Sequence, residues 1–451
     1  MLPKTGINIG IIFNSTKPYN EFKELLLPSL LSQDLNVVNI FTFQNKIQDP
    51  EKRFIDIKSR LIKKFHIIYH LAMIWKLRDS SISYKFRALN ELGTNWERAK
   101  NLNNFHVYNC NRSWIEKFII RLFARKTLLK LLKKVLEHLF FYYLSTKHKL
   151  ILDKIKILIV PYGARLSLEE DFLIWFAKQQ KIKTISIQEN WDNLSSKKFI
   201  YGETDLFLTW GKQSSQHLRD IQNYKAKILE IGCIRMQQFY NYFDTRLVIT
   251  KTQSKSKIDS RLKNILVIGN GSLNDVDLYR YVSEMDILQL FSQSKGLNFV
   301  FRPHPFSRLD MNKSFTSKHN KYLKIDIPES NEKNIYRMKL IARADLVVGF
   351  YSTVLLEALI MGKVVAIPSF LWRDLSYKPE DYLNDSAHYQ GLRNSPNVYN
   401  FSSKVNFEQF INDLPMPVSN LNSRLIVEAC CANQDTVKSI TRIINELVTS
   451  R

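Results

Sequence analysis

The most regular stretch of the hydrophobic pattern runs from residue 299 to residue 370, as an apolar run, a polar cluster, a helix and a second apolar run. Short apolar runs bounded by turn residues are typical of strands that are buried on both faces of a parallel sheet. Such sheets bind ligands at the carboxyl ends of their strands. Two polar clusters follow predicted strands here, Arg302-Pro303-His304-Pro305 and Tyr351-Ser352-Thr353, so we expect them to face one ligand site.

The same alternation begins at the N-terminus. The predicted strands of this first half are 7–13, 37–43, 105–108, 155–160, 184–188, 205–211 and 228–232, and the predicted helices include 20–32, 51–77 and 169–179. A second series of strands starts at residue 264. Strands that alternate with helices indicate an α/β protein with parallel sheets. We predict two Rossmann-like domains, at 1–240 and 263–422, joined by a flexible segment at 241–262 and followed by a C-terminal helix within 423–451.

The residue types of the two clusters suit a phosphate-bearing ligand. Arg302 and His304 are donors to phosphate oxygens. Ser352 and Thr353 are good N-cap residues, and a helix N-terminus attracts anions. Glu357 lies one turn further on and could accept hydrogen bonds from sugar hydroxyls. In the alternative interpretation, the Ser-Thr pair only caps a helix and His304 only closes a turn.

A Gly-x-Gly turn, Gly269 to Gly271, ends the first strand of the second domain and would let the backbone approach a phosphate. It lacks the third glycine of a dinucleotide fingerprint, so alone it is weak support.

These motifs resemble those of a known family. Arg302-Pro303-His304-Pro305, Tyr351-Ser352-Thr353 and Glu357 are similar to the "HP" and "S/T" motifs of bacterial GT-B glycosyltransferases, such as capsule Kdo and sialic-acid transferases and CDP-glycerol glycerophosphotransferases. The resemblance is strongest over 263–370. A weaker one covers 189–197 and the Gly-x-x-Arg segment at 232–235.

The resemblance implies a GT-B fold, with two Rossmann-like domains whose parallel sheets face a central cleft. It implies that the His and the Ser/Thr pair hold the phosphate of a nucleotide donor, and that the C-terminal helix crosses back toward the first domain. Loops of the first domain would bind the acceptor. Their polar residues are Asn14, Ser15, Tyr162, Arg165, Asn190 and Trp191.

Glycosyl transfer needs a base for the acceptor hydroxyl. Asp192 is the first candidate because it follows a predicted strand of the opposing domain, although it could instead cap a turn. Glu169, Glu170 and Glu189 are rivals, with Glu189 next in order. No convincing D-x-D loop is present, so we expect neither a metal nor a cofactor. The CMP-, CDP- or UDP-linked donor would be a substrate.

Composition adds a strong basic bias. The formal net charge is +24, from 66 Lys and Arg against 42 Asp and Glu, which favours polyanionic partners. An AT-rich genome could produce the same lysine bias. The four cysteines show no C-x-x-C spacing, and no run of apolar residues is long enough to span a membrane. With no signal peptide recognised, we expect a cytoplasmic protein.

Residues 113–152 combine apolar residues with many lysines and arginines. This pattern fits a helix on the anionic inner face of the plasma membrane. A helix docked on the sheet, with its lysines in water, is the alternative and the one that we favour. Docking and membrane contact can coexist.

The sequence therefore predicts an enzyme of polysaccharide biosynthesis in the cell envelope or capsule. It would move a sugar or polyol phosphate from a nucleotide-activated donor to a surface glycan or lipid-linked acceptor. A sugar-nucleotide epimerase of similar fold is the alternative within enzymes. A basic nucleic-acid-binding protein is the alternative from another class, but no RNP, KH, zinc-finger or helix-turn-helix pattern occurs, so we expect no nucleic acid partner.

Overall fold

The computed structural model describes residues 7–14, 16–33, 35–42, 52–80, 113–144, 149, 151–163, 167–197, 199–241, 263–269, 297–303, 323–326, 334–349, 352–368, 370, 387–389, 392, 395–413 and 435–449. The chain forms two compact units. Unit 1 comprises residues 1–94, 111–237 and 428–451, and unit 2 comprises 95–110 and 238–427. Within the described residues, none of the helices combines the length and the hydropathy needed to span a bilayer.

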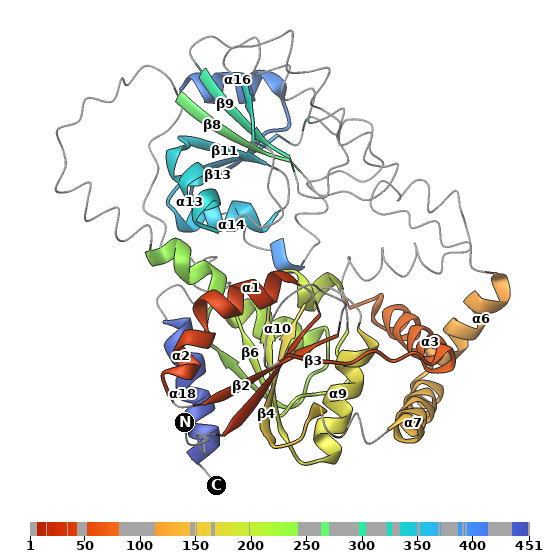
Figure 1. Ribbon diagram of the computed structural model, residues 1–451. Coiled ribbons are helices and arrows are strands. Elements are labelled where there is room, and N and C mark those ends of the chain that lie inside the picture. Colours follow the sequence, from red (N-terminus) through yellow and green to blue (C-terminus); the bar gives the residue numbers. More distant parts are fainter. Residues whose placement is uncertain are drawn as a thin grey trace. The chain divides into compact units, whose positions relative to one another are not determined.

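Unit 1 is built on a parallel sheet with the strand order β3-β2-β1-β4-β5-β6-β7 (Figure 1). Its strands are β1 (Asn8–Phe13), β2 (Asn36–Phe41), β3 (Lys52–Phe54), β4 (Ile155–Tyr162), β5 (Lys183–Gln188), β6 (Leu206–Thr209) and β7 (Lys227–Glu230). Every neighbouring pair runs parallel. The chain proceeds outward from β1 in one direction and from β4 in the other, so the strand order reverses between these two strands.

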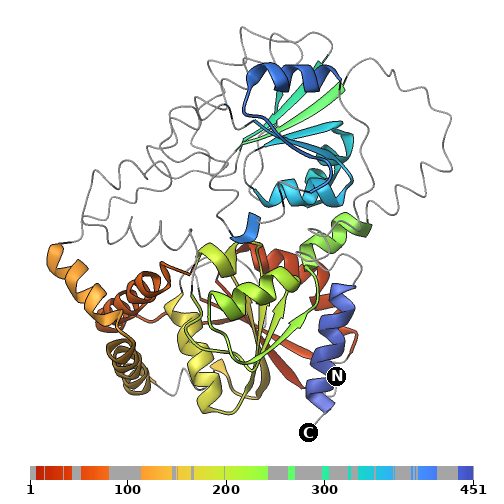
Figure 2. The ribbon, with the colours of Figure 1, turned by 180° about the vertical axis from the view of Figure 1, so that it is seen from behind.

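Helices cover both faces of this sheet (Figures 1 and 2). One face carries α1 (Thr16–Leu25), α2 (Leu27–Leu31) and α18 (Thr436–Thr449), and the other carries α3 (Arg60–Leu77), α7 (Lys126–Tyr143) and α9 (Leu168–Gln179). Alternate residues of β1 enter different cores: Ile11 and Phe13 join the α18 side, and Ile12 joins the α9 side. This period of two is what a strand buried on both faces requires.

Two local predictions for unit 1 were wrong. The helix expected over 20–32 is two helices, α1 and α2, because Pro28 stands at the start of α2, where it cannot donate to a preceding turn. The helix expected from residue 51 is preceded by the short strand β3, which pairs with β2. Three residues are too few to show a period, so pairing with β2 decided the structure. The strand expected at 105–108 lies outside the described residues.

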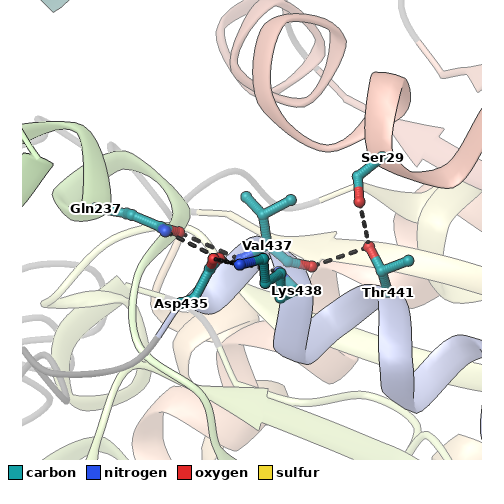
Figure 3. Close-up of polar contacts among 6 residues, drawn as sticks. All are labelled: Ser29, Gln237, Asp435, Val437, Lys438 and Thr441. Atoms are coloured by element: carbon teal, nitrogen blue, oxygen red, sulfur yellow. Dashed lines mark hydrogen bonds and ion pairs between the residues drawn. The ribbon is translucent and has the colours of Figure 1, made fainter. Parts of the chain in front are cut away.

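The last described helix, α18, is held in unit 1 by polar contacts at its N-terminus and first turns (Figure 3). Asp435 Oδ1 accepts from the backbone N–H of Lys438 at 3.1 Å and from Gln237 Nε2 at 2.9 Å. In the second turn of α18, Thr441 Oγ1 lies 2.8 Å from Ser29 Oγ of α2. Figures 1 and 2 both show α18 beside α2. The C-terminal segment thus completes one core of unit 1.

Unit 2 has a second parallel sheet, with the order β10-β9-β8-β11-β12-β13. Its strands are β8 (Lys263–Ile268), β9 (Leu297–Arg302), β10 (Leu323–Ile325), β11 (Leu346–Gly349), β12 (Val364–Ile367) and β13 (Val398–Asn400). Its helices include α13 (Asn334–Arg343), α14 (Thr353–Ile360) and α16 (Lys404–Asn412). Here the order reverses between β8 and β11. The predicted fold class, two Rossmann-like α/β parts with parallel sheets, is confirmed. The predicted domain boundaries stay a prediction.

Candidate active site

In each unit, the strand order reverses at one point, where parallel α/β sheets form their ligand-binding crevice. In unit 1 this point lies between β1, which Asn14 follows, and β4, which ends at Tyr162 and is followed by Gly163. In unit 2 it lies between β8, which Gly269 follows, and β11, after which Ser352 begins α14. The predicted site residues that the structure describes gather at or beside these two reversal points, each within its own unit.

Asn14 is tied to a buried acid. It is itself buried, and its Nδ2 donates to Glu170 Oε2 at 3.0 Å. Glu170 is in the first turn of α9, where Ser167 is the N-cap and accepts from the Glu170 backbone N–H at 3.1 Å. A carboxylate in the first turn is favoured by the helix dipole. The pair therefore joins the end of β1 to the start of α9.

Glu189 lies against the end of β4. Its backbone N–H donates to the Tyr162 carbonyl at 3.2 Å. A Cβ added at Gly163 would lie only 2.3 Å from Glu189 Oε2, so the carboxylate occupies the space that any other residue at 163 would fill. Glu189 is partly exposed. A carboxylate with this placement lies at the carboxyl edge of the sheet, beside the strand-order reversal.

The loop after Glu189 is anchored at several points. The Trp191 ring is fully buried, and its Nε1 donates to Gln213 Oε1 in α10 (Lys212–Asp220) at 2.6 Å. Asn193 Nδ2 donates to the Tyr162 carbonyl at 2.7 Å and begins a π-helical turn (Asn193–Lys197). Asp192 lies between these two anchors and is partly exposed. Its neighbours thus fix the position of the Asp192 backbone.

Arg235 brings a buried positive charge to the same edge. Its Nη1 lies 3.4 Å from Asn190 Oδ1 and 3.8 Å from Glu21 Oε1 in α1. Its guanidinium also lies 5.8 Å from the centre of the Trp210 ring, which follows β6. Three residues earlier, Gly232 has φ 87°, a conformation that favours glycine. The Gly-x-x-Arg spacing therefore turns the chain so that Arg235 contacts the loop after β5.

Cys233, within the same segment, is fully enclosed. Burial raises the pKa of its thiol to about 12, and the nearby Arg235 offsets only part of this effect. The thiolate is therefore rare at neutral pH, which argues against a nucleophilic cysteine here.

In unit 2, three strand ends meet at the predicted donor edge. The Gly269 backbone N–H donates to the Arg302 carbonyl at 2.8 Å, which joins the ends of β8 and β9. Ser352 is the N-cap of α14, and its hydroxyl accepts from the Val354 backbone N–H at 3.2 Å. Thr353 is the first residue of this helix. Ser352 therefore does cap α14, and the N-terminus of this helix lies at the strand-order reversal.

Arg302 forms contacts within unit 2. Its guanidinium is buried and forms an ion pair with Asp326, which follows β10. Tyr336 in α13 donates to the other oxygen of Asp326 at 2.5 Å. These contacts hold the guanidinium at the end of β9. Direct phosphate binding by Arg302 stays a prediction.

Glu357 is also engaged. Arg337 Nη2 donates to Glu357 Oε1 at 3.1 Å, and Arg337 Nε lies 2.8 Å from Glu357 Oε2. Such a two-point Arg–carboxylate pair is strong and directional. It joins α13 to α14, so Glu357 is oriented before any ligand arrives. Its predicted contact with sugar hydroxyls stays a prediction.

Five predicted site residues lie outside the described residues: Ser15, Arg165, Gly271, His304 and Tyr351. Among the described residues, no three His, Cys, Asp or Glu side chains gather as a metal site would need. The sequence pattern gives no indication of the partners that hold the site residues, which are Gln213, Asp326, Tyr336 and Arg337. Their separation along the chain from the residues that they contact leaves no local signal.

Comparison with known proteins bears on the fold. No family model matches the chain, and no curated protein matches its sequence. A Listeria monocytogenes structure with a proposed UDP-N-acetylglucosamine 2-epimerase assignment is similar, with a TM-score of 0.51, 11% identity and coverage of 99% of this chain and 98% of that one. The wall teichoic acid polymerase TagF has a TM-score of 0.48 at 11% identity, covering 98% and 90%. At such identity the likeness shows the fold alone, and the fold class is GT-B.

Proposed function

We propose that this protein is a metal-independent glycosyltransferase, which moves a sugar or polyol phosphate from a nucleotide-activated donor to a surface glycan or lipid-linked acceptor. The observation that carries the proposal is the pair of strand-order reversals. One has a carboxylate at its edge, Glu189 beside Gly163, and the other has a capped helix N-terminus at Ser352. An acid and an anion site on two Rossmann-like units suit the activation of an acceptor and the binding of a phosphate-bearing donor.

The donor would bind to unit 2. The N-terminus of α14 offers its dipole and backbone N–H groups to the phosphates, beside the backbone of Gly269. His304 and Tyr351 join this set by the motif resemblance. Glu357 and Arg302 are held by Arg337 and by Asp326, so their side chains would be in place before the donor binds. Preorganised groups of this kind reduce the entropy lost on binding.

The acceptor would bind to unit 1. We propose Glu189 as the base, with Asp192 as the alternative, because Gly163 provides the space in which the Glu189 carboxylate lies. The base takes the proton of an acceptor hydroxyl, and that oxygen forms a bond to the donor sugar carbon or glycerol phosphorus. The bond to the nucleotide phosphate breaks, and the nucleotide leaves with the electron pair. Asn14, Tyr162 and Asn190 belong to the same edge.

A lipid-linked acceptor would be presented at a bilayer. We therefore also propose that the protein is cytoplasmic and makes peripheral contact with the anionic inner face of the plasma membrane. The net charge of +24 favours such a partner.

A sugar-nucleotide epimerase is the competing function, since a structural neighbour carries that assignment. An epimerase converts its nucleotide sugar without an acceptor, and this difference decides the test. A thermal-shift screen against CMP, CDP, UDP and GDP first identifies the nucleotide, and a ligand at 100 times its Kd should add about 2.7 kcal/mol of stability.

The corresponding nucleotide sugars are then incubated with the protein, with and without envelope glycolipids. The proposal predicts that nucleotide is released much faster when an acceptor is present. Conversion of the donor into its epimer without an acceptor would replace the transferase with the epimerase. Salt-sensitive DNA binding without any nucleotide response would favour a nucleic-acid-binding protein.

A further inference from the structure

Helix α6 (Trp114–Phe123) exposes apolar side chains that an ordinary surface helix would bury. Trp114, Ile115 and Phe118 are 77%, 50% and 60% exposed. Trp114 and Phe118 are four residues apart and Ile115 and Phe118 are three apart, so all three lie on one face of the helix. A contiguous exposed apolar surface of this kind marks a contact with a partner or a membrane.

The opposite face of α6 packs in unit 1, where Ile120 is buried. Arg121, three residues after Phe118, lies at the edge of the exposed face, and its guanidinium is 4.7 Å from the centre of the Trp75 ring of α3. At the N-terminus, Ser113 and Glu116 form a reciprocal capping box. The helix is therefore fixed by its cap and by α3, and it presents Trp114 and Phe118 outward. If α6 rotated to bury Trp114 and Phe118, it would lose the packing of Ile120 and the contact between Arg121 and Trp75.

The next helix, α7, buries a full apolar stripe, although Leu131 and Phe141 on its other sides are exposed. Its apolar stripe, Leu129, Leu132, Leu136 and Phe140, is buried in the core of unit 1. The docking predicted for the whole segment 113–152 thus holds for the stripe of α7. It does not hold for the apolar face of α6.

Most of the exposed charges of this helix pair are basic. Lys126, Lys130 and Lys134 follow one another at intervals of four residues on α7, and all three are exposed. Lys133 is different, because it points inward and donates to the Tyr201 carbonyl at 2.9 Å. The acid Glu116 is engaged in the cap of α6. An exposed apolar face on α6, together with exposed lysines on the helix that follows it, is complementary to a bilayer with anionic headgroups.

We propose that α6 is an interfacial anchor, with Trp114, Ile115 and Phe118 at the boundary of headgroups and acyl chains of an anionic bilayer, and with the α7 lysines on the headgroup phosphates. A second copy of the chain fits less well, because it would bring like-charged lysines together. This inference deepens the membrane partner of the proposed function. It requires neither a donor nor transfer chemistry.

Flotation of the full chain with phosphatidylcholine vesicles, with and without 30% phosphatidylglycerol, tests the anchor. The parent should bind the anionic vesicles. Trp114→Ser/Phe118→Ser should weaken this binding roughly ten-fold or more, from the apolar area lost. Neutralising Lys126, Lys130 and Lys134 to Gln should weaken it by about five-fold per residue and remove most of its salt dependence. Val405→Ser, at an exposed apolar residue of α16, is the matched control and should change nothing.

A second measurement, tryptophan fluorescence quenching, gives a result even if the double variant does not fold. Brominated lipids quench a tryptophan that enters the bilayer, and Trp114→Phe should keep vesicle binding while losing most of this quenching. Absence of parent binding, parent-like binding by the double variant, or undiminished quenching in Trp114→Phe would each overturn the anchor. Self-association of the parent without vesicles, lost in the double variant, would assign the face to a second copy. Nucleotide binding is measured separately, so failure of the donor site leaves this result intact.

Discussion

A methyl group at Gly163 would compete directly with the Glu189 carboxylate. The added Cβ would lie 2.3 Å from Oε2 and 2.9 Å from Cδ, whereas ordinary contacts begin near 3.4 Å. In Gly163→Ala the carboxylate must therefore move by about 1 Å. The obstructing atoms belong to the end of a flexible side chain, so the strain should stay near that of an off-rotamer torsion, about 0.5–1.5 kcal/mol.

The effects on stability and on rate should differ in size. About 1 kcal/mol of strain lowers the Tm of a unit of this size by roughly 2–4 °C. If Glu189 is the base, misplacing it by about 1 Å should slow transfer by about 10²-fold, or about 2.7 kcal/mol of barrier. Glu189→Gln should slow transfer by about 10²- to 10⁴-fold with little change in Tm.

The assay is nucleotide release from the donor, in single turnover with acceptor, together with Tm and nucleotide Kd on the same preparation. Gly202→Ala is the control, because its added Cβ would meet only Ile174 Cγ2, at 3.3 Å. It should keep the parent rate. If Gly163→Ala also keeps the parent rate per folded molecule, Glu189 is not the base.

Three further outcomes are expected. Asp192→Asn should bind donor normally and transfer within a few-fold of the parent rate if Glu189 is the base, and a loss of about 10²-fold or more would assign the role to Asp192 instead. Transfer should survive EDTA, and loss that magnesium or manganese restores would contradict metal independence. Asp435→Ala should cost about 1 kcal/mol of unfolding free energy through the lost cap of α18, measured by denaturant titration. Burial raises the pKa of Asp435, but hydrogen bonds from Gln237 and Lys438 outweigh this effect, and its pKa lies below the ordinary 3.8. The stability difference between parent and Asp435→Ala should therefore be full above pH 3.8 and vanish as the pH falls through the pKa of the folded state. A stability difference that stays constant down to low pH would contradict the role of the Asp435 charge.

The sequence predicts most of the fold because both sheets are parallel and buried on both faces. Apolar runs therefore mark strands, and their ends mark the site, as at Asn14, Gly269 and Ser352. It could not predict β3, since three residues carry no period. The break between α1 and α2 was signalled by Pro28, but the helical pattern outweighed it in our interpretation.

The side-chain pairs of the site were beyond sequence reasoning for a different reason. Arg337 and Glu357 are 20 residues apart, and Arg302 and Asp326 are 24 apart. No helical or strand period connects such positions, because each pair forms only when two elements pack together. The same holds for α6: its pattern shows an apolar face, but only the burial of Ile120 on the opposite face and the measured exposure of Trp114 show that the apolar face stays outside.

Calorimetric titration of the identified nucleotide into the full chain tests the donor site most directly. We predict that His304→Ala and Ser352→Ala each weaken nucleotide binding, because we propose that both side chains bind the donor phosphates. Ser59→Ala is the control, because it removes the N-cap of α3 in unit 1. It should lose about as much stability as Ser352→Ala but keep the parent affinity for the nucleotide. Parent affinity in both His304→Ala and Ser352→Ala would contradict a donor site at the α14 N-terminus.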